Sequence, residues 1–135
     1  MPRIAIPPSA ASIASVRRAL ATDLKGVGGS EGVADATLVL SELVSNAVRH
    51  AEPVAGEGLV VNWQIESDGL MVLIAVTDAS VDDEPRAQPA NTASESGRGL
   101  AIVDLLASAW GVRRTQNHKT VWARVPLGRR LAHLQ

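Results

Sequence analysis

Three polar residues on one predicted helix are the first candidates for chemistry in this sequence. Glu42, Asn46 and Arg49 follow one another at spacings of four and three in SELVSNAVRHA, so they share a narrow stripe of one helix face. Apolar residues on either side suffice for the core, which leaves this stripe available to line a pocket. For a Glu and an Asn at this spacing taken alone, a solvated helix face is the more common explanation.

Two later segments carry groups that suit a nucleotide. Asp78 ends the most apolar stretch, LMVLIAVTD, where an open sheet tends to present ligand-binding groups, and a carboxylate that caps the next turn is the equal alternative. In Ser96-Gly97-Arg98-Gly99-Leu100 two glycines precede a predicted helix. Backbone N–H groups and the positive helix end are then available to phosphate oxygens, although a single G-x-G also occurs in ordinary turns. Thr120, beside Lys119 at the start of the last predicted strand, is the weakest candidate.

Hydrophobic periodicity predicts the elements that must position these residues. Three helices are indicated: from Ser9 or Ser12 to Gly26, from the GVGGSEG breaker to about His50, and opening at GRGLAIVDLLASAW. Five strands are predicted at 3–6, 59–66, 70–78, 110–115 and 119–125, the first at a sheet edge and the third covered on both faces. The expected class is α+β, a two-layer α/β sandwich with three helices on one face of a mixed sheet.

Length and composition exclude several classes of function. With 135 residues, 46% of them apolar, the chain is expected to form one domain over residues 1–135. A balance of 13 basic and 14 acidic residues gives a net charge of −1, which argues against direct nucleic-acid binding and attachment to an anionic membrane. There is no cysteine, the longest apolar run is too short to span a bilayer, and the N-terminus lacks the apolar stretch of a signal peptide. A cytoplasmic protein is therefore expected.

The order of these segments resembles the ATP-binding domains of the GHKL superfamily, shared by gyrase, heat-shock chaperones, histidine kinases and mismatch-repair ATPases. SELVSNAVRHA resembles its N box, VTDAS stands at its first glycine box, SGRGLAIVDLLA at its second, and KTVWARV at its closing strand. Within the superfamily the sequence is most similar to anti-sigma factor serine kinases, particularly the short regulators of actinobacteria. The resemblance covers nearly the whole chain.

The resemblance implies a role for each candidate residue on the helix and the strands. Glu42 would be the general base that orients an attacking hydroxyl, and Asn46 would be the protein ligand of Mg²⁺, which takes its other oxygens from water and phosphates. Asp78 would accept a hydrogen bond from the adenine amino group, and Thr120 would help to hold that carboxylate or a bridging water.

The same resemblance places the second glycine segment at the phosphates of the nucleotide. Backbone N–H groups of Gly97, Gly99 and the adjoining Leu100 would bind phosphate oxygens, and the guanidinium of Arg98 would neutralise their charge. Arg49 would reach the phosphates from the helix stripe.

One departure from the family pattern concerns the first glycine box. The family has D-x-G-x-G, whereas Ser80 and Asp82 stand here in place of both glycines, which normally bring backbone close to the nucleotide and allow a lid to move. Residues 80–96 would form a short lid. Residues from Leu127 onward are expected to form a tail outside the predicted elements.

The resemblance implies a cytosolic regulator that binds ATP or ADP with Mg²⁺. Such a protein transfers the γ-phosphoryl group to a serine of an anti-anti-sigma antagonist protein and sequesters a sigma factor. The alternative is a non-catalytic module of the same fold that switches partners by nucleotide-dependent binding alone, and a homodimer is compatible with either function.

Overall fold

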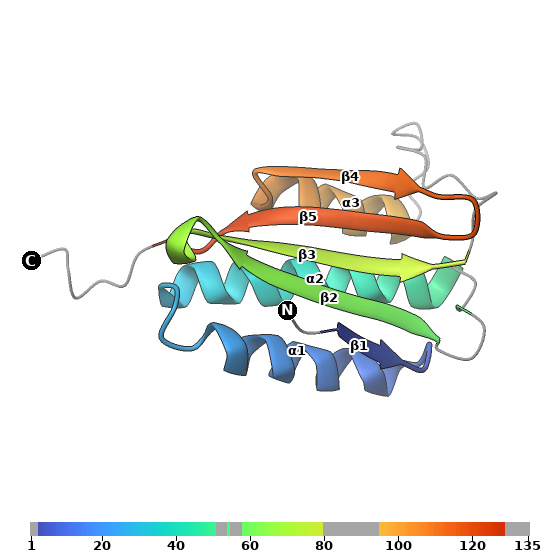
Figure 1. Cartoon of the computed structure of the whole chain (residues 1–135), viewed down its shortest axis with the longest axis horizontal. Coiled ribbons are helices and arrows are strands. Elements are labelled where there is room, and N and C mark those ends of the chain that lie inside the picture. The colour runs from blue at the N-terminus through green and yellow to red at the C-terminus, as the bar shows by residue number, and fades with distance from the viewer. Residues whose placement is uncertain (1–2, 51–53, 55–57, 80–94, 129–135) are drawn as a thin grey trace, which may run out of the picture.

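Three helices pack on one face of a five-stranded sheet in the part of the chain that the computed structural model describes, residues 3–50, 54, 58–79 and 95–128 (Figure 1). In chain order the elements are β1 (Arg3–Ile6), α1 (Ala10–Leu24), α2 (Ser30–His50), β2 (Leu59–Glu66), the short 3-10 helix η1 (Ser67–Gly69), β3 (Met71–Asp78), α3 (Glu95–Leu106), β4 (Ala109–Arg114) and β5 (Lys119–Pro126). The predicted α+β class with helices on one face is confirmed.

The sheet has the order β1-β2-β3-β5-β4, which confirms β1 as an edge strand. The prediction of a mixed sheet is wrong, because all four described pairings are antiparallel. The reason is the position of β5. The connection through α3 makes β4 run in the same direction as β3, but β5 turns back from β4 and inserts between them.

The two faces of the sheet differ in what covers them. On β3, Val72, Ile74 and Val76 point toward the helices and are buried, whereas Leu73 and Thr77 on the opposite side are only half-buried. No described helix covers this second side, which we call the open face. The prediction that this strand is covered on both faces is therefore wrong, because its apolar run is buried on one side by helices and on the other only by neighbouring strands.

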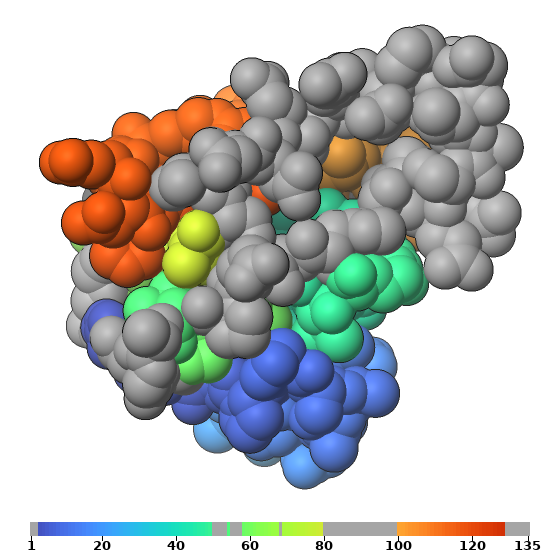
Figure 2. All heavy atoms as spheres, turned by 90° about the vertical axis from the view of Figure 1, so that its right-hand side faces the viewer, coloured from blue at the N-terminus to red at the C-terminus, as the bar shows by residue number. Residues whose placement is uncertain are grey.

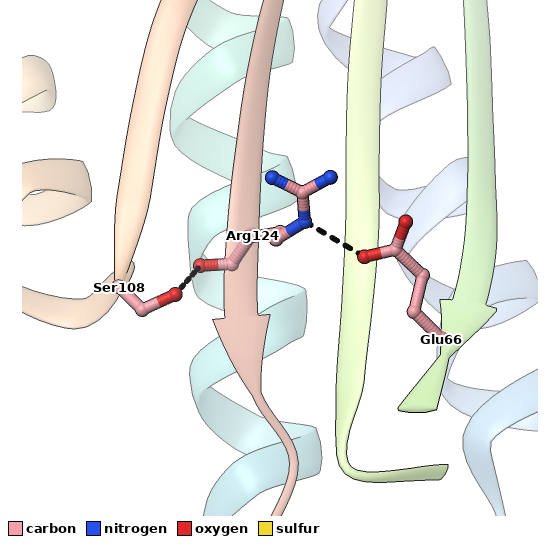
Figure 3. Close-up of polar contacts among 3 residues, drawn as sticks. All are labelled: Glu66, Ser108 and Arg124. Atoms are coloured by element: carbon pink, nitrogen blue, oxygen red, sulfur yellow. Dashed lines mark hydrogen bonds and ion pairs between the residues drawn. The ribbon is translucent and has the colours of Figure 1, made fainter. Parts of the chain in front are cut away.

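A polar bridge crosses three strands on the open face (Figure 3). Arg124 on β5 donates from Nε to Glu66 Oε1 on β2 over 2.8 Å, and its guanidinium lies 5.7 Å from the centroid of the Trp122 ring. The hydrogen bond and the charge of Glu66 raise the pKa of Arg124. The Ser108 hydroxyl donates to the Arg124 carbonyl at 3.3 Å. Arg124 is therefore hydrogen-bonded to residues on both sides of β5.

Helix α2 lies at the centre of the helix layer, where it contacts α1, α3, β3 and β5. Its buried residues recur at helical spacing, which explains why this segment is an amphipathic helix facing the sheet: Ala36, Val39, Leu40, Leu43, Val44 and Ala47. Among the described residues, no helix is both long and apolar enough to cross a membrane.

Leu127 is an unexpected part of the core, because it lies in the segment that the sequence left outside any element. Its side chain is 0% exposed, its N–H donates to the Leu70 carbonyl at 2.8 Å, and its own carbonyl accepts from Gly29 N–H at 3.0 Å. A Cβ at Gly32 would overlap the Leu127 carbonyl. Two glycines of the GVGGSEG segment, Gly28 before α2 and Gly32 in its first turn, therefore make room for the chain after β5.

We expect Gly32→Ala to destabilise the protein, although alanine is normally the better helix residue. The added methyl group must displace the backbone of Leu127, which should lower the free energy of unfolding by roughly 1–3 kcal/mol in urea titrations. Ala34→Gly, at an exposed position of the same helix, is the control and should cost roughly 0.5–1 kcal/mol through propensity alone. A gain in stability for Gly32→Ala would contradict this account of Leu127.

A second prediction concerns the buried indole of Trp63. Its side chain is 2% exposed, and Nε1 donates to Asp23 Oδ2 on α1 at 2.7 Å. Asp23→Ala leaves this donor buried without its acceptor, which should cost roughly 1–3 kcal/mol of unfolding free energy. The matched control is Asp104→Ala, which removes the acceptor of the more exposed Trp110 indole at 3.0 Å and should cost clearly less. Equal losses in the two variants would rule out a special role for the Asp23 bond.

Candidate functional site

Four segments that are distant in sequence meet at one end of the molecule. The C-terminal half of α2, the end of β3, the start of β5 and the start of α3 lie at the right-hand end of Figure 1. The register of β3 and β5 places Asp78 opposite Lys119, and α2 contacts β3, β5 and α3. Figure 2 looks onto this end of the molecule. The structure thus brings together the segments that carry the candidate residues.

The polar stripe of α2 lies in the half of the helix at this end of the molecule. Glu42 and Asn46 are half-buried, and Arg49 is exposed one turn further on. Leu43 and Ala47, each one position later than Glu42 and Asn46, are buried in the core. Because these apolar neighbours fix the rotation of α2 against the sheet, they also fix the direction of the stripe.

The side-chain oxygen of Asn46 is the most informative atom of the stripe. Oδ1 is buried and has no hydrogen-bond partner in the described part of the chain. Leaving such an acceptor unsatisfied is costly, so native structures usually compensate it. An amide oxygen is also a ligand that a hard cation such as Mg²⁺ accepts. Asn46 therefore fits the role of Mg²⁺ ligand that the family resemblance implies.

A cation at Asn46 would obtain most of its ligands from outside the protein. Within the described ranges, no group of three or more His, Asp or Glu side chains could hold a metal ion by itself. Magnesium commonly keeps several waters and binds through one or two protein oxygens together with substrate phosphates. The donor set thus suits a metal that arrives with a phosphate ligand.

Asp78 lies at the end of β3 on the helix-facing side, and its side chain is 2% exposed. Lys119, directly opposite on β5, is 6% exposed and lies on the same side. Sequence reasoning treated Lys119 only as the neighbour of Thr120. Its signal was the alternation of β5, because Lys119 has the same parity as the buried Val121 and Ala123.

Thr120 lies on the other side of the sheet. Its Oγ1 is 2.7 Å from the Oγ1 of Thr77, the residue opposite it on β3. Successive side chains of a strand point to opposite faces, so the sheet itself separates Thr120 from Asp78. The structure therefore does not bring Thr120 to the Asp78 carboxylate, and its hydroxyl supports the β3–β5 pairing on the open face instead.

The second glycine segment lies inside α3 rather than before it. The helix begins at Glu95, so Gly97, Arg98 and Gly99 belong to its first turns, and Leu100, which follows them in the helix, is half-buried. The expectation that the glycines precede the helix is corrected accordingly. The first N–H groups of a helix still lack intrahelical partners, so the start of α3 retains donors for an anion.

The structure describes only the last residues of the predicted lid. Residues 80–94, including Ser80 and Asp82 in place of the family glycines, lie outside the described residues. The last two residues of the predicted lid, Glu95 and Ser96, belong to α3.

Comparison with known proteins identifies the family of this chain. Residues 6–125 match the family described as the histidine kinase-like ATPase domain. The chain is 35% identical over 98 residues to an anti-sigma F factor from Pasteuria penetrans, covering 67% of this chain and 65% of that relative. It thus spans just under two thirds of the relative's length.

The fold is also found in a solved structure of low sequence identity. The chain superposes on the crystal structure of the RsbU and RsbW domains of a Mycobacterium tuberculosis protein with a TM-score of 0.65 and 23% identity, covering 96% of this chain and 34% of that one. The family match extends from the end of β1 almost to the end of β5, and it confirms the resemblance inferred from the motifs. The chain belongs to the histidine kinase-like ATPase domain family.

Proposed function

We propose that this chain is a cytoplasmic, ATP-binding anti-sigma regulator that transfers the γ-phosphoryl group of ATP to a serine of an antagonist protein. The observation that carries the proposal is the Oδ1 of Asn46, which is buried and has no hydrogen-bond partner among the residues that the structure describes. In a histidine kinase-like ATPase domain, such an atom suits a metal that accompanies a nucleotide. Similarity to an anti-sigma F factor supports sigma-factor sequestration and the anti-anti-sigma class of antagonist.

The nucleotide would lie between α2, the end of β3 and the start of α3. Asp78 would accept from the adenine amino group, and N–H groups of the first turn of α3 would donate to phosphate oxygens. Arg49 and Arg98 would add positive charge near the phosphates. Asn46 Oδ1 would be one ligand of a bound Mg²⁺, which would supply positive charge to the transferred group.

Glu42 is the residue of this chain that would handle the proton. Its carboxylate accepts the hydrogen of the serine hydroxyl while the serine oxygen bonds to the γ-phosphorus. The bond between that phosphorus and the β–γ bridging oxygen breaks, and ADP leaves. Glu42 lies one helical turn before Asn46 and is half-buried, so base and metal ligand share one rigid element.

The first test separates the metal ligand from the base. Asn46→Ala should weaken ATP binding strongly in the presence of Mg²⁺ and only slightly in its absence, since it removes a cation ligand and no nucleotide contact. Glu42→Ala should leave both affinities nearly unchanged. Calorimetric titration of ATP with and without Mg²⁺ measures the four values.

Asn62→Ala is the matched control, because Asn62 is a half-buried asparagine on the open face, away from the site. It should leave both affinities unchanged. If Asn46→Ala and Glu42→Ala weaken ATP to the same extent regardless of Mg²⁺, the stripe is structural and both assigned roles are wrong.

The second test addresses catalysis. Incubation with labelled ATP and candidate antagonist proteins from the same genome should transfer label to a serine of one of them. Glu42→Gln should slow the transfer by roughly 10²–10⁴-fold while ATP still binds, because it removes the base and keeps the shape of the side chain. Glu31→Gln, at an exposed position in the first turn of the same helix, should transfer at the normal rate.

The competing function predicts a different result. The absence of both glycines from the first glycine box favours a module that binds nucleotide without transferring phosphate. ATP-dependent binding of an antagonist without any labelling would establish that module in place of the kinase.

A further inference from the structure

Lys119 is a buried cation beside the carboxylate that the proposed function assigns to adenine. Its side chain is 6% exposed, and that of Asp78 is 2% exposed. Lysine is rarely buried to this extent, because the ammonium group must find compensation for its lost hydration. The burial of Lys119 therefore places a cation on the same side of the sheet as the Asp78 carboxylate.

The register places the two charged groups within reach of one ligand. Asp78 and Lys119 are direct cross-strand partners at the end of the β3–β5 ladder, and residues opposite each other have Cβ atoms about 4.5–5.5 Å apart. Both side chains point to the helix-facing side, as their burial and the alternation of the strands show. A planar ligand held by the carboxylate therefore also meets the stem or the ammonium group of Lys119.

The two groups have complementary hydrogen-bonding capacity. A carboxylate only accepts hydrogen bonds, and an ammonium group only donates them. Adenine offers an amino donor next to a ring-nitrogen acceptor, whereas guanine offers a carbonyl acceptor next to a ring N–H donor. Asp78 alone would repel the guanine carbonyl. With a lysine beside it, Asp78 can accept from the donor of either base, and Lys119 can donate to the acceptor. The donor and the acceptor have opposite positions in adenine and guanine, so the two side chains exchange the positions that they contact.

We infer that Lys119 is a base-reading residue that acts with Asp78 and admits GTP as well as ATP to this site. The inference rests on the proposed nucleotide site and adds the determinant of its purine selectivity. Lys119 supplies the donor for the acceptor on the base, and Asp78 supplies the acceptor for its donor. Without Lys119 the site becomes selective for adenine, because adenine keeps its bond to Asp78 whereas the guanine carbonyl faces a carboxylate.

Calorimetric titration of ATP and GTP into the wild-type protein and Lys119→Met tests this inference. The two nucleotides carry the same triphosphate, so the ratio of their affinities isolates the contribution of the base. Lys119→Met should weaken GTP binding far more than ATP binding and raise the ATP-to-GTP affinity ratio roughly tenfold or more, the loss expected for a hydrogen bond to a charged group. Lys119→Arg keeps the charge and the donors and should preserve the wild-type ratio.

The chain offers a matched control, because Lys25 is its one other lysine. Lys25 is exposed after α1, and Lys25→Met changes the net charge by the same amount as Lys119→Met. It should leave the ratio unchanged. With only two lysines, NMR of the wild-type protein labelled at lysine Cε should give two signals, and ATP or GTP should shift the signal of Lys119 but not that of Lys25. This readout does not depend on the variant folding.

The outcomes separate this inference from the proposed function. If neither nucleotide binds the wild-type protein, the proposed function is wrong and the inference fails with it. If ATP binds and Asp78→Asn weakens it, but Lys119→Met leaves the ratio unchanged, Lys119 is only a structural partner of the strand pair and the inference alone is wrong. If Lys119→Met weakens the affinity for ATP and for GTP equally, Lys119 contacts the phosphates and the inference is wrong. The inference is also wrong if the NMR signal of Lys119 does not shift when a nucleotide is added.

Discussion

The packing of α2 against the sheet is the constraint on which the rest of the structure depends. This helix contacts both other helices and the two central strands β3 and β5, and its apolar side is buried along nearly its whole length. Since that burial determines the rotation of the helix, it also determines where Glu42 and Asn46 point. The hydrophobic effect thereby sets the direction of these two polar side chains.

The two ends of the molecule have different physical character. At the end formed by η1, Leu127 fills the space left by glycines, and the Arg124–Glu66 bridge crosses three strands. The opposite end carries the buried Asp78 and Lys119 and the Oδ1 of Asn46, which has no hydrogen-bond partner among the described residues. An amide oxygen left in this way reduces stability unless a ligand compensates it. The end formed by η1 is thus held by apolar packing and an ion pair, whereas the opposite end has polar groups that suit ligand binding.

Antiparallel pairing of β3 with β5 is what gives the site its charge pattern. The last residue of β3, Asp78, and the first residue of β5, Lys119, lie opposite each other. This register places an anionic and a cationic side chain next to each other on the helix-facing side of the sheet. A shift of the register by one residue would bring Thr120 to the helix-facing side and move Lys119 to the open face. The hydroxyl pair of Thr77 and Thr120 lies on the open face in the same register.

The sequence by itself determined the elements, the class and the family, because periodicity and motif order can be read along one chain without knowledge of its tertiary contacts. Asn46 and Asp78 became candidate site residues through the spacing and order of the same motifs. The tertiary structure alone decided that the sheet is antiparallel throughout, that Leu127 is core and that Thr120 faces away from Asp78. Each of these depends on which strands become neighbours and in which register. That choice is made by contacts between distant segments, and no local pattern around Lys119 states that its partner across the sheet is Asp78.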